Sequence, residues 1–246
     1  MLRLEQVSKT YAKQGVKAVD GLTLHVQPGE IFGFIGPNGA GKTTTIKMIT
    51  GILRPDAGSV TIHGHDIARE PIAAKRCIGY VPDAQEVYDR LTGLEYLHFM
   101  ADMYGVSAPA RAERIARYLA MFSLEDAAGA QIRGYSRGMR QKLTLIGALL
   151  HQPPLWLLDE PLVGLDPNAA HLLKQEMRAH CQAGNTVFFS THVLEVAEKL
   201  CDRIGIIAKG KLVAVGTLDA LRGQEHAGTL ESIFLQMTAQ EAQEEA

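Results

Sequence analysis

A glycine-rich stretch, GPNGAGKTT, occupies residues 36–44 directly after the apolar run IFGFI. Its glycines allow the backbone to curl so that successive N–H groups point at one anion, and a helix beginning at Gly41 adds the positive end of its dipole. Lys42 adds a full positive charge, and Thr43 adds a hydroxyl oxygen of the kind that Mg²⁺ binds. We therefore expect a phosphate-binding loop, with an unliganded glycine-rich turn as the alternative. The residues expected to contact a nucleotide are Gly36, Pro37, Asn38, Gly39, Ala40, Gly41, Lys42, Thr43 and Thr44.

Two carboxylates follow a second apolar run in the segment LWLLDEP. Consecutive side chains of a strand point in opposite directions, so Asp159 and Glu160 are expected to have different roles. Asp159 suits a Mg²⁺ ligand, and Glu160 is then free to orient or deprotonate a water molecule. The alternative is a pair of capping carboxylates. Trp156, the only tryptophan, lies within the run and is expected in the core.

His192 follows a third apolar run, NTVFFS, in the way that Glu160 follows its own strand. Parallel strands bring their carboxyl ends to one edge of a sheet, where ligands bind, so we expect His192 near Glu160. A lone histidine is commonly only a satisfied polar group, but this position favours a catalytic role.

Tyr11 lies in a region rich in Lys and Gly that is expected to form a loop. Its ring either stacks on a purine base or serves as a packing residue. The residue types alone leave both roles open.

The segment YSRGMRQ, residues 135–141, precedes the apolar helix pattern KLTLIGALL. Ser136 is placed as the N-cap of that helix, which leaves the first N–H groups and the positive dipole end for a ligand. An ordinary capped helix explains the pattern equally well.

The segment HGHDI brings His63, His65 and Asp66 close together in sequence. A polar hairpin tip is the simpler explanation, because no second group of ligands has zinc-like spacing. The three cysteines are widely spaced and form neither a disulfide framework nor a CxxC pair.

Composition limits the class of protein. A chain of 246 residues with 46% hydrophobic content can bury one core with an inserted subdomain. The net charge of −2 and the absence of a basic block give no reason to expect nucleic acid. The N-terminus lacks the apolar core of a signal peptide, and the longest apolar stretch, LTLIGALL, is too short to cross a bilayer. We expect a cytosolic chain whose membrane role, if any, comes through a partner.

Strands and helices must hold these residues together. Apolar alternation at 2–7 and 22–26 predicts antiparallel strands with one wet face, and the runs SVTI, RCIGYV, LWLLD, NTVFFS, RIGIIA and KLVAVG predict further strands. Helices are expected over the P-loop segment TTTIKMIT, over 111–122 and 169–181, and from Thr217 toward an acidic end. Residues from about 84 to 150 are helix-rich and inserted between strands. Within them, Leu94, Leu97 and Met100 or Ala101 are expected on one helix face.

In combination and order, the glycine loop, the Pro82 region, YSRGMRQ, LWLLDEPLVGLD and the STH end of a strand resemble the ATP-binding cassette (ABC) family. The resemblance covers about residues 2–216 and is to stand-alone nucleotide-binding subunits of bacterial-type transporters. It implies an α/β fold: a P-loop NTPase (RecA-like) core with an antiparallel β-subdomain and an inserted helical subdomain. It implies one ATPase domain over 1–220, with the helical subdomain at about 84–150, followed by a C-terminal helix and acidic tail over 221–246.

The resemblance also implies roles for matching residues. Residues 36–44 are similar to the family's Walker A loop and 155–159 to its Walker B strand. Glu160 corresponds to the catalytic carboxylate, and His192 to the switch histidine that contacts the γ-phosphate. Tyr11 resembles the aromatic that stacks on adenine, and 162–166 resembles the D-loop at the dimer seam.

Two motifs depart from the family pattern. The signature LSGGQ appears as YSRGM, so Ser136 and Gly138 are kept while Arg137 and Met139 are substitutions. In the family this segment closes over ATP held by the opposite subunit of a head-to-tail dimer. Asp83 stands where the family usually has a glutamine that touches Mg²⁺. Its carboxylate can bind Mg²⁺, but it adds negative charge and cannot donate a hydrogen bond. Gln85 lies two residues further on.

The implied function is an ATP-hydrolysing subunit that uses ATP and Mg²⁺, pairs with itself or a homologous cassette, and drives an integral membrane permease. It would lie on the cytoplasmic face of the membrane, with the segment around Val87, Tyr88 and Leu91 passing movement to the permease. An exporter is favoured, although the cargo, the permease and the choice of homodimer or heterodimer stay open. One alternative is a soluble ABC ATPase outside transport, for example in iron–sulfur cluster assembly. A non-hydrolysing nucleotide sensor is another; a P-loop kinase or GTPase gives no reason for YSRGM.

Overall fold

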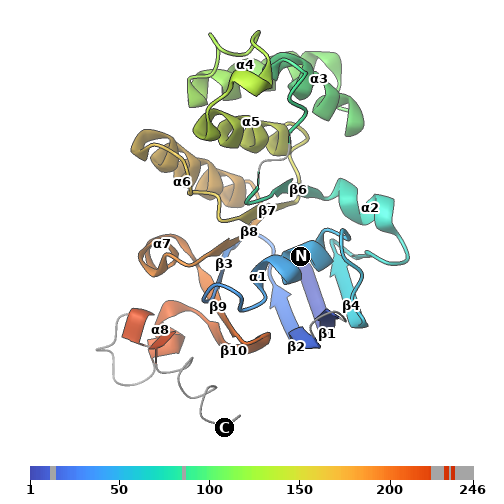
Figure 1. Cartoon of the computed structure of the whole chain (residues 1–246), viewed down its shortest axis with the longest axis vertical. Coiled ribbons are helices and arrows are strands. Elements are labelled where there is room, and N and C mark those ends of the chain that lie inside the picture. The colour runs from blue at the N-terminus through green and yellow to red at the C-terminus, as the bar shows by residue number, and fades with distance from the viewer. Residues whose placement is uncertain (12–14, 85–86, 223–229, 233, 236–246) are drawn as a thin grey trace.

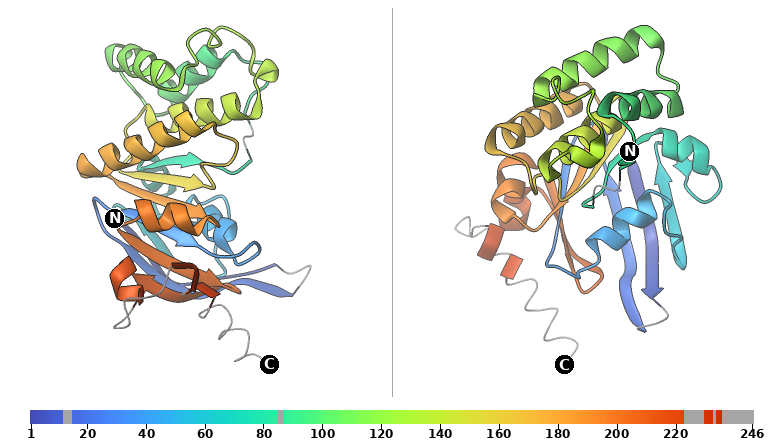
Figure 2. Two further views of the ribbon diagram at one scale, coloured as in Figure 1. Left: turned by 90° about the vertical axis from the view of Figure 1, so that its left-hand side faces the viewer. Right: turned by 45° about the horizontal axis from the view of Figure 1, so that its top comes forward.

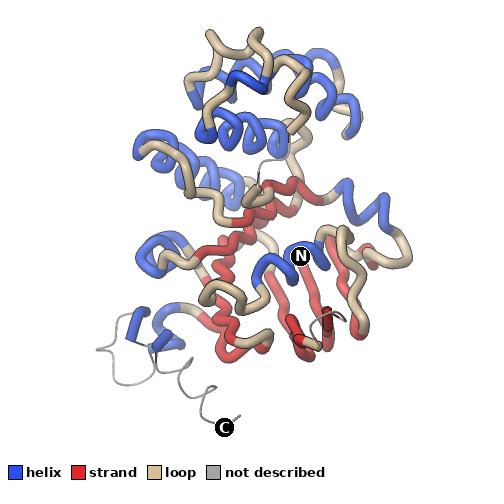
Figure 3. Tube along the Cα trace, viewed as in Figure 1, coloured by secondary structure: helices blue, strands red, loops and turns tan. Residues whose placement is uncertain are grey.

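A six-stranded sheet runs through the middle of the molecule (Figure 1, Figure 3). The computed structural model describes residues 1–11, 15–84, 87–222, 230–232 and 234–235. The strand order is β10-β9-β3-β8-β7-β6, and every neighbouring pair is parallel except β10 with β9. Strands β3, β7 and β8 are buried along their whole length, because both faces of the sheet are covered. The strands are β3 (Ile31–Ile35), β6 (Ile78–Val81), β7 (Leu155–Asp159), β8 (Thr186–Thr191), β9 (Arg203–Ala208) and β10 (Lys211–Gly216).

A second, antiparallel sheet has the order β2-β1-β4-β5. Its strands are β1 (Leu2–Tyr11), β2 (Val16–Val26), β4 (Ala57–Ile62) and β5 (His65–Asp66). The apolar side chains of β1 and β2 join a core with Phe32 and Phe34 of β3 and Ile46 of the first helix. The expectation that Tyr11 lies in a loop is wrong. Tyr11 is the last residue of strand β1 and pairs with Val16.

The helices fall into two groups. Between β6 and β7 the chain forms α3 (Gly93–Met103), α4 (Ala108–Phe122), the short 3-10 helix η1 (Ile132–Gly134) and α5 (Arg137–Leu149). Helices α3 and α4 lie at the end of the molecule farthest from α8 (Figure 1, Figure 2), and this group shares a core with one face of the large sheet. The other helices are α1 (Lys42–Ile49), α2 (Pro71–Arg76), α6 (Pro167–Gln182), α7 (Leu194–Leu200) and α8 (Leu218–Arg222).

The predicted face of α3 needs one correction. Leu94 is 38% exposed, whereas Gly93, Tyr96, Leu97 and Ala101 are buried. The Thr92 side chain accepts from the Glu95 N–H, and the Glu95 carboxylate accepts from the Thr92 N–H. This capping box starts the helix at Gly93 and turns Leu94 outward. The helices α2 and α7 were not predicted, because six and seven residues are too few to show a helical period. Most of the predicted C-terminal tail lies outside the described residues.

Two histidines, the half-buried His151 and the buried His180, lie where the helical group meets the sheet. His151 stacks on Tyr104 with ring centroids 3.7 Å apart, and its Nε2 lies 3.2 Å from the carbonyl oxygen of Ile78. His180 of α6 packs edge-on against Trp156 of β7. Burial, the largest cause in each case, lowers the pKa of both histidines to about 4. Both rings are therefore neutral in the folded protein at pH 7.

We expect mild acid to destabilise the fold through these two residues. In the unfolded chain their pKa values return to about 6.5, so below that pH the unfolded state binds protons that the folded state rejects. The contribution of the two neutral histidines to the free energy of unfolding is fully present above about pH 6.5. It falls as the pH drops toward 4, by about 2 kcal/mol per histidine between pH 7 and pH 5. Urea unfolding at the two pH values measures the loss. His151→Phe should remove about half of it, whereas His98→Phe on the exposed face of α3 should keep it, and an equal loss in both variants would contradict the assignment.

Candidate functional site

The glycine-rich loop joins β3 to α1 along a tightly confined path. Gly41 caps α1 with φ of 107°, and a Cβ on it would lie 2.4 Å from the carbonyl oxygen of Ala18. A Cβ on Gly36 would lie 2.4 Å from the carbonyl oxygen of Ile207. At Gly41 both the backbone angle and the neighbouring backbone exclude a side chain, and at Gly36 the neighbouring backbone alone excludes one. The N-terminus of α1, with its unpaired N–H groups, is thereby fixed at the carboxyl end of β3.

A cavity of about 330 Å³ opens beside this loop. It brings together ten of the residues singled out from the sequence. Gly36 and Ala40 belong to the same loop but do not line the cavity; Ala40 is buried in the core behind it. The lining residues are Tyr11, Val16, Ala18, Pro37, Asn38, Gly39, Gly41, Lys42, Thr43, Thr44, Asp83 and Glu160.

Lys42 is folded against its own loop. Its Nζ donates to the carbonyl oxygen of Gly36 at 2.6 Å and to that of Pro37 at 3.2 Å. Burial lowers the pKa of Lys42, while the negative charges of Glu160 and Asp159 oppose that shift. The ammonium group thus lies between the loop backbone and the two carboxylates.

The two strand-end carboxylates of β7 differ in environment. Asp159 is 1% exposed, and its Oδ1 accepts a hydrogen bond from the Ser190 hydroxyl at 2.5 Å. Its Oδ2 is buried and has no hydrogen-bond partner among the described residues. Burial raises the pKa of Asp159, and the nearby Ser190 and Thr43 hydroxyls oppose the rise. Asp159 is held deep in the structure beside Thr43, at the start of α1.

The backbone of Glu160, the residue after β7, departs from the extended conformation of the strand. Its backbone adopts the left-handed conformation, with φ of 49°, which is uncommon for a residue with a side chain. Its Oε1 lies 3.0 Å from His192 Nδ1 and 3.9 Å from Lys42 Nζ. The carboxylate therefore lies between two basic groups at the mouth of the cavity, with His192 52% exposed on its outer side.

The residues present suit a magnesium ion carried by a nucleotide. The unpartnered Oδ2 of Asp159 and the neighbouring Thr43 hydroxyl are hard oxygen ligands, and the negative charge of Asp83 lies close enough to raise the pKa of Asp159. Among the described residues, no group of three His, Cys, Asp or Glu side chains could hold a metal ion by itself. This donor set matches Mg²⁺, which takes one or two protein ligands and completes its shell with phosphate and water.

The cluster at His63, His65 and Asp66 is occupied by local contacts. His65 Nδ1 lies 3.1 Å from Glu70 Oε1, and Asp66 Oδ1 accepts from the N–H groups of Ala68 and Arg69. These bonds close the turn that follows the β4–β5 hairpin.

Ser136 and Gly138 lie at the start of α5 and do not line the cavity. The Ser136 hydroxyl accepts from the Met139 N–H at 3.2 Å, which confirms the predicted N-cap. Gln141 donates to the carbonyl oxygen of Pro161 at 3.1 Å, and a Cβ on Gly138 would lie 2.9 Å from the carbonyl oxygen of Gly164. The first turns of α5 are thereby braced against residues 161–166, which follow Glu160 in the chain.

Tyr11 and Asp83 both lie at the cavity. The Tyr11 hydroxyl is 3.4 Å from Thr44 Oγ1, and 39% of its side chain is exposed. Asp83 is also exposed. Gln85 lies outside the described residues.

Ser190 was not singled out from the sequence, although it contacts both β7 carboxylate residues. The one sequence signal that could have indicated a role for Ser190 is its position two residues before His192, at the end of the apolar run. Its importance becomes visible only when the register pairs it with Asp159 across the sheet.

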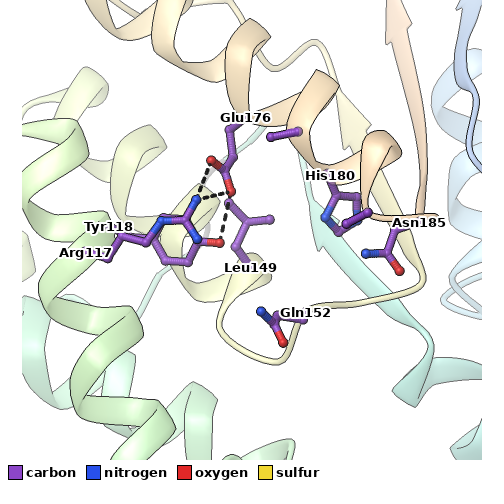
Figure 4. Close-up of a pocket in the computed structure, with 9 residues that line it drawn as sticks. Arg117, Tyr118, Leu149, Gln152, Glu176, His180 and Asn185 are labelled. Carbon is purple, nitrogen blue, oxygen red and sulfur yellow. Dashed lines mark hydrogen bonds and ion pairs between the residues drawn. The ribbon is translucent and has the colours of Figure 1, made fainter.

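A larger cavity, of about 470 Å³, lies elsewhere, between α4 and α6 (Figure 4). Glu176 of α6 projects toward it and accepts from Arg117 at 2.9 Å and from the Tyr118 hydroxyl at 3.1 Å. These contacts fasten the helical group to α6. None of the residues singled out for chemistry lines this cavity, so the smaller cavity at the glycine loop is the candidate site.

No helix in the described part of the chain is both long and apolar enough to span a bilayer.

Known proteins share this arrangement. Residues 19–163 match the sequence model of the family described as ABC transporter. The linearmycin resistance ATP-binding protein LnrL of Bacillus subtilis is 39% identical over 217 residues, which cover 88% of this chain and 69% of LnrL. The Nod factor export ATP-binding protein I of Burkholderia pseudomallei is 42% identical over 212 residues, 86% of this chain and 69% of that protein.

Solved structures similar to this chain come from the same family. An ATP-binding subunit of an ABC transporter superposes with a TM-score of 0.92 at 35% identity, over 97% of this chain and 99% of the other. A dimeric ATP-binding cassette in a post-hydrolysis state, bound to ADP and Pi, superposes with a TM-score of 0.81 at 27% identity, over 89% of this chain and 99% of the other.

Proposed function

Because this chain belongs to the ABC transporter family, as an ATP-hydrolysing nucleotide-binding subunit, we propose that its cavity is one half of a composite ATP site. The observation that supports this most strongly is the convergence of Lys42 and His192 on one oxygen of Glu160 beside the glycine loop. A basic group on each side of a carboxylate suits a reaction in which negative charge develops on a phosphoryl group.

In this proposal, backbone N–H groups of residues 36–44 bind the phosphates together with Lys42, which exchanges its bonds to the loop carbonyls for phosphate oxygens. Tyr11, at the open side of the cavity, stacks on the adenine ring. Thr43, Asp159 and Asp83 would hold a magnesium ion, whose charge neutralises the phosphate oxygens.

Glu160 orients the attacking water molecule and accepts its proton. His192 fixes the Glu160 carboxylate through the 3.0 Å contact and is exposed enough to reach the γ-phosphate as well. Lys42 stabilises the charge that spreads over the γ-phosphate oxygens in the transition state.

The other half of each site comes from a second copy, or from a homologous cassette, arranged head to tail. Ser136 and Gly138 lie exposed or half-exposed at the start of α5, away from the cavity of their own chain. They can complete a site only by facing the cavity of a partner, where the α5 N-terminus would add hydrogen-bond donors and dipole charge.

We assign residues 1–220 to one ATPase domain with a helical subdomain inserted at about 84–150, followed by the C-terminal segment 221–246. That subdomain exposes the apolar side chains of Tyr88, Leu94, Phe99 and Met103. Tyr88 and Phe99 meet edge to face at 5.6 Å. We propose that a membrane permease docks here and that the protein lies on the cytoplasmic face of the membrane. Because relatives are named for Nod factor export and for linearmycin resistance, we propose an exporter.

Mixing two inactive variants tests the composite site. Lys42→Met spoils the phosphate loop and Ser136→Arg spoils the opposite surface, so neither protein alone should hydrolyse ATP. In a mixed pair, one of the two sites combines an intact loop with an intact Ser136. Random pairing should therefore restore about one quarter of the parental rate of phosphate release.

Circular dichroism and thermal unfolding of each variant alone serve as the folding control. Ser136→Arg also removes a helix cap, which should cost about 1 kcal/mol of stability and leave the fold in place. Two folded variants that stay inactive after mixing would contradict the head-to-tail arrangement.

A further inference from the structure

One side chain connects the two carboxylate residues of the site. Ser190 lies in β8, fully buried, directly opposite Asp159 in the parallel register. Its hydroxyl donates to Asp159 Oδ1 at 2.5 Å and accepts from the Glu160 N–H at 3.2 Å. A hydroxyl has one hydrogen, so these two bonds fix its orientation completely.

The hydrogen bond to the Glu160 N–H stabilises the left-handed backbone conformation that orients the Glu160 side chain. The Glu160 N–H is shared between the hydroxyl and the carbonyl oxygen of Ser190, each at 3.2 Å. This double anchor lies at the residue whose φ is 49°, a conformation that persists only where its surroundings impose it. The bend takes the Glu160 side chain out of the strand alternation and places it between Lys42 and His192.

The bond to Asp159 decides which of its oxygens stays available. Oδ1 is occupied by the Ser190 hydrogen, whereas Oδ2 is buried without a hydrogen-bond partner among the described residues. Ser190 thus leaves one particular oxygen for a metal ion. A rotation of the carboxylate would break a short hydrogen bond inside the core.

We propose that Ser190 is a positioning residue that sets the placement of Asp159 and Glu160 relative to each other. The inference rests on the proposed ATP hydrolysis and adds a residue to it. Ser190 is fully buried, so its effect would reach the reaction through Asp159 and Glu160.

Ser190→Ala removes the hydroxyl with the smallest change in volume. We expect kcat for ATP hydrolysis to fall by about 30-fold, because small misplacements of catalytic groups cost up to about 100-fold, while KM for ATP changes less than about 3-fold. Ser190→Thr restores the hydroxyl and should recover most of the rate.

Thermal unfolding supplies a measurement that is independent of turnover. ATP with EDTA should raise the Tm of Ser190→Ala as much as that of the parent, because the phosphate loop is unchanged. The further rise on adding Mg²⁺ should be smaller in Ser190→Ala, and Ser190→Thr should regain it.

Thr186→Val is the matched control at the other end of the same strand. The Thr186 hydroxyl is also fully buried and bridges two groups, accepting from the Gly29 N–H and donating to the carbonyl oxygen of Gln27, both at 3.1 Å. Its loss should lower the Tm of the protein without ligands and leave kcat and the Mg²⁺ increment unchanged.

The inference is overturned if folded Ser190→Ala keeps kcat within about twofold of the parent, or if it matches Thr186→Val in every measurement. It is also overturned if folded Ser190→Thr is no better than Ser190→Ala, because the hydroxyl is then not the cause. If the parent protein itself neither hydrolyses ATP nor is stabilised by it, the proposed function fails, whereas an active parent with an unaffected Ser190→Ala contradicts the role of Ser190 alone.

Discussion

Glu160→Gln is expected to lower steady-state ATP hydrolysis by about 10³-fold, the contribution typical of a general base, while ATP binding persists. Glutamine has the shape of the carboxylate but cannot accept the proton of the attacking water. It also removes the negative charge that lies 3.9 Å from Lys42. The phosphate loop is untouched, so affinity for ATP should be equal to or higher than that of the parent.

Phosphate release under saturating MgATP measures the rate, and equilibrium binding of a fluorescent ATP analogue measures the affinity. Glu195→Gln is the matched control, since it makes the same chemical change at an exposed carboxylate that pairs with Lys199 on the surface of α7. Hydrolysis by Glu160→Gln at the parental rate would remove Glu160 from the reaction.

Lys42→Met should weaken ATP binding and strongly lower ATP hydrolysis. Methionine keeps the length and apolar character of the stem but removes the ammonium group. Loss of one group that stabilises transition-state charge lowers turnover by about 10²–10³-fold, and the weaker ground-state contact with the phosphates adds a loss of affinity. This separates Lys42 from Glu160, whose replacement spares binding.

Protein stability should not follow activity in this variant. The Lys42 ammonium is buried, and its desolvation opposes its bonds to Gly36 and Pro37. Methionine removes that desolvation cost but leaves the two carbonyl oxygens without their donor, so the free energy of unfolding should fall by about 1–3 kcal/mol while the protein still folds. Lys47→Met, on the exposed side of the same helix, is the control and should keep both binding and turnover. Normal nucleotide affinity in Lys42→Met would mean that phosphates bind elsewhere.

Much of the site could be predicted because its residues are tied to strand ends. Local structure is defined without help from distant residues by the run IFGFI, by the glycine pattern and by the carboxylates Asp159 and Glu160 after the run LWLL. The placement of His192 beside Glu160 followed from the rule that parallel strands end at one edge, and β7 and β8 are indeed neighbours.

The parts that could not be predicted depend on contacts between distant residues. Leu94 fits a helical stripe, but the capping box decides where α3 begins and so which way the stripe faces. Tyr11 belongs to a strand because Val16 pairs with it after a short connection. Ser190 gains its partners only through the register with β7, which no property of NTVFFS reveals.

The contacts between α5 and residues 161–166 couple the helical subdomain to Glu160 within one chain. Gln141 is fully buried and holds the Pro161 carbonyl, and Lys142 pairs with Asp166 at 2.9 Å. A movement of α3 and α4 that shifts α5 would act on the peptide that directly follows Glu160, the proposed general base. The position of the helical subdomain is thereby coupled to Glu160 within one chain, through the Gln141–Pro161 hydrogen bond and the Lys142–Asp166 ion pair.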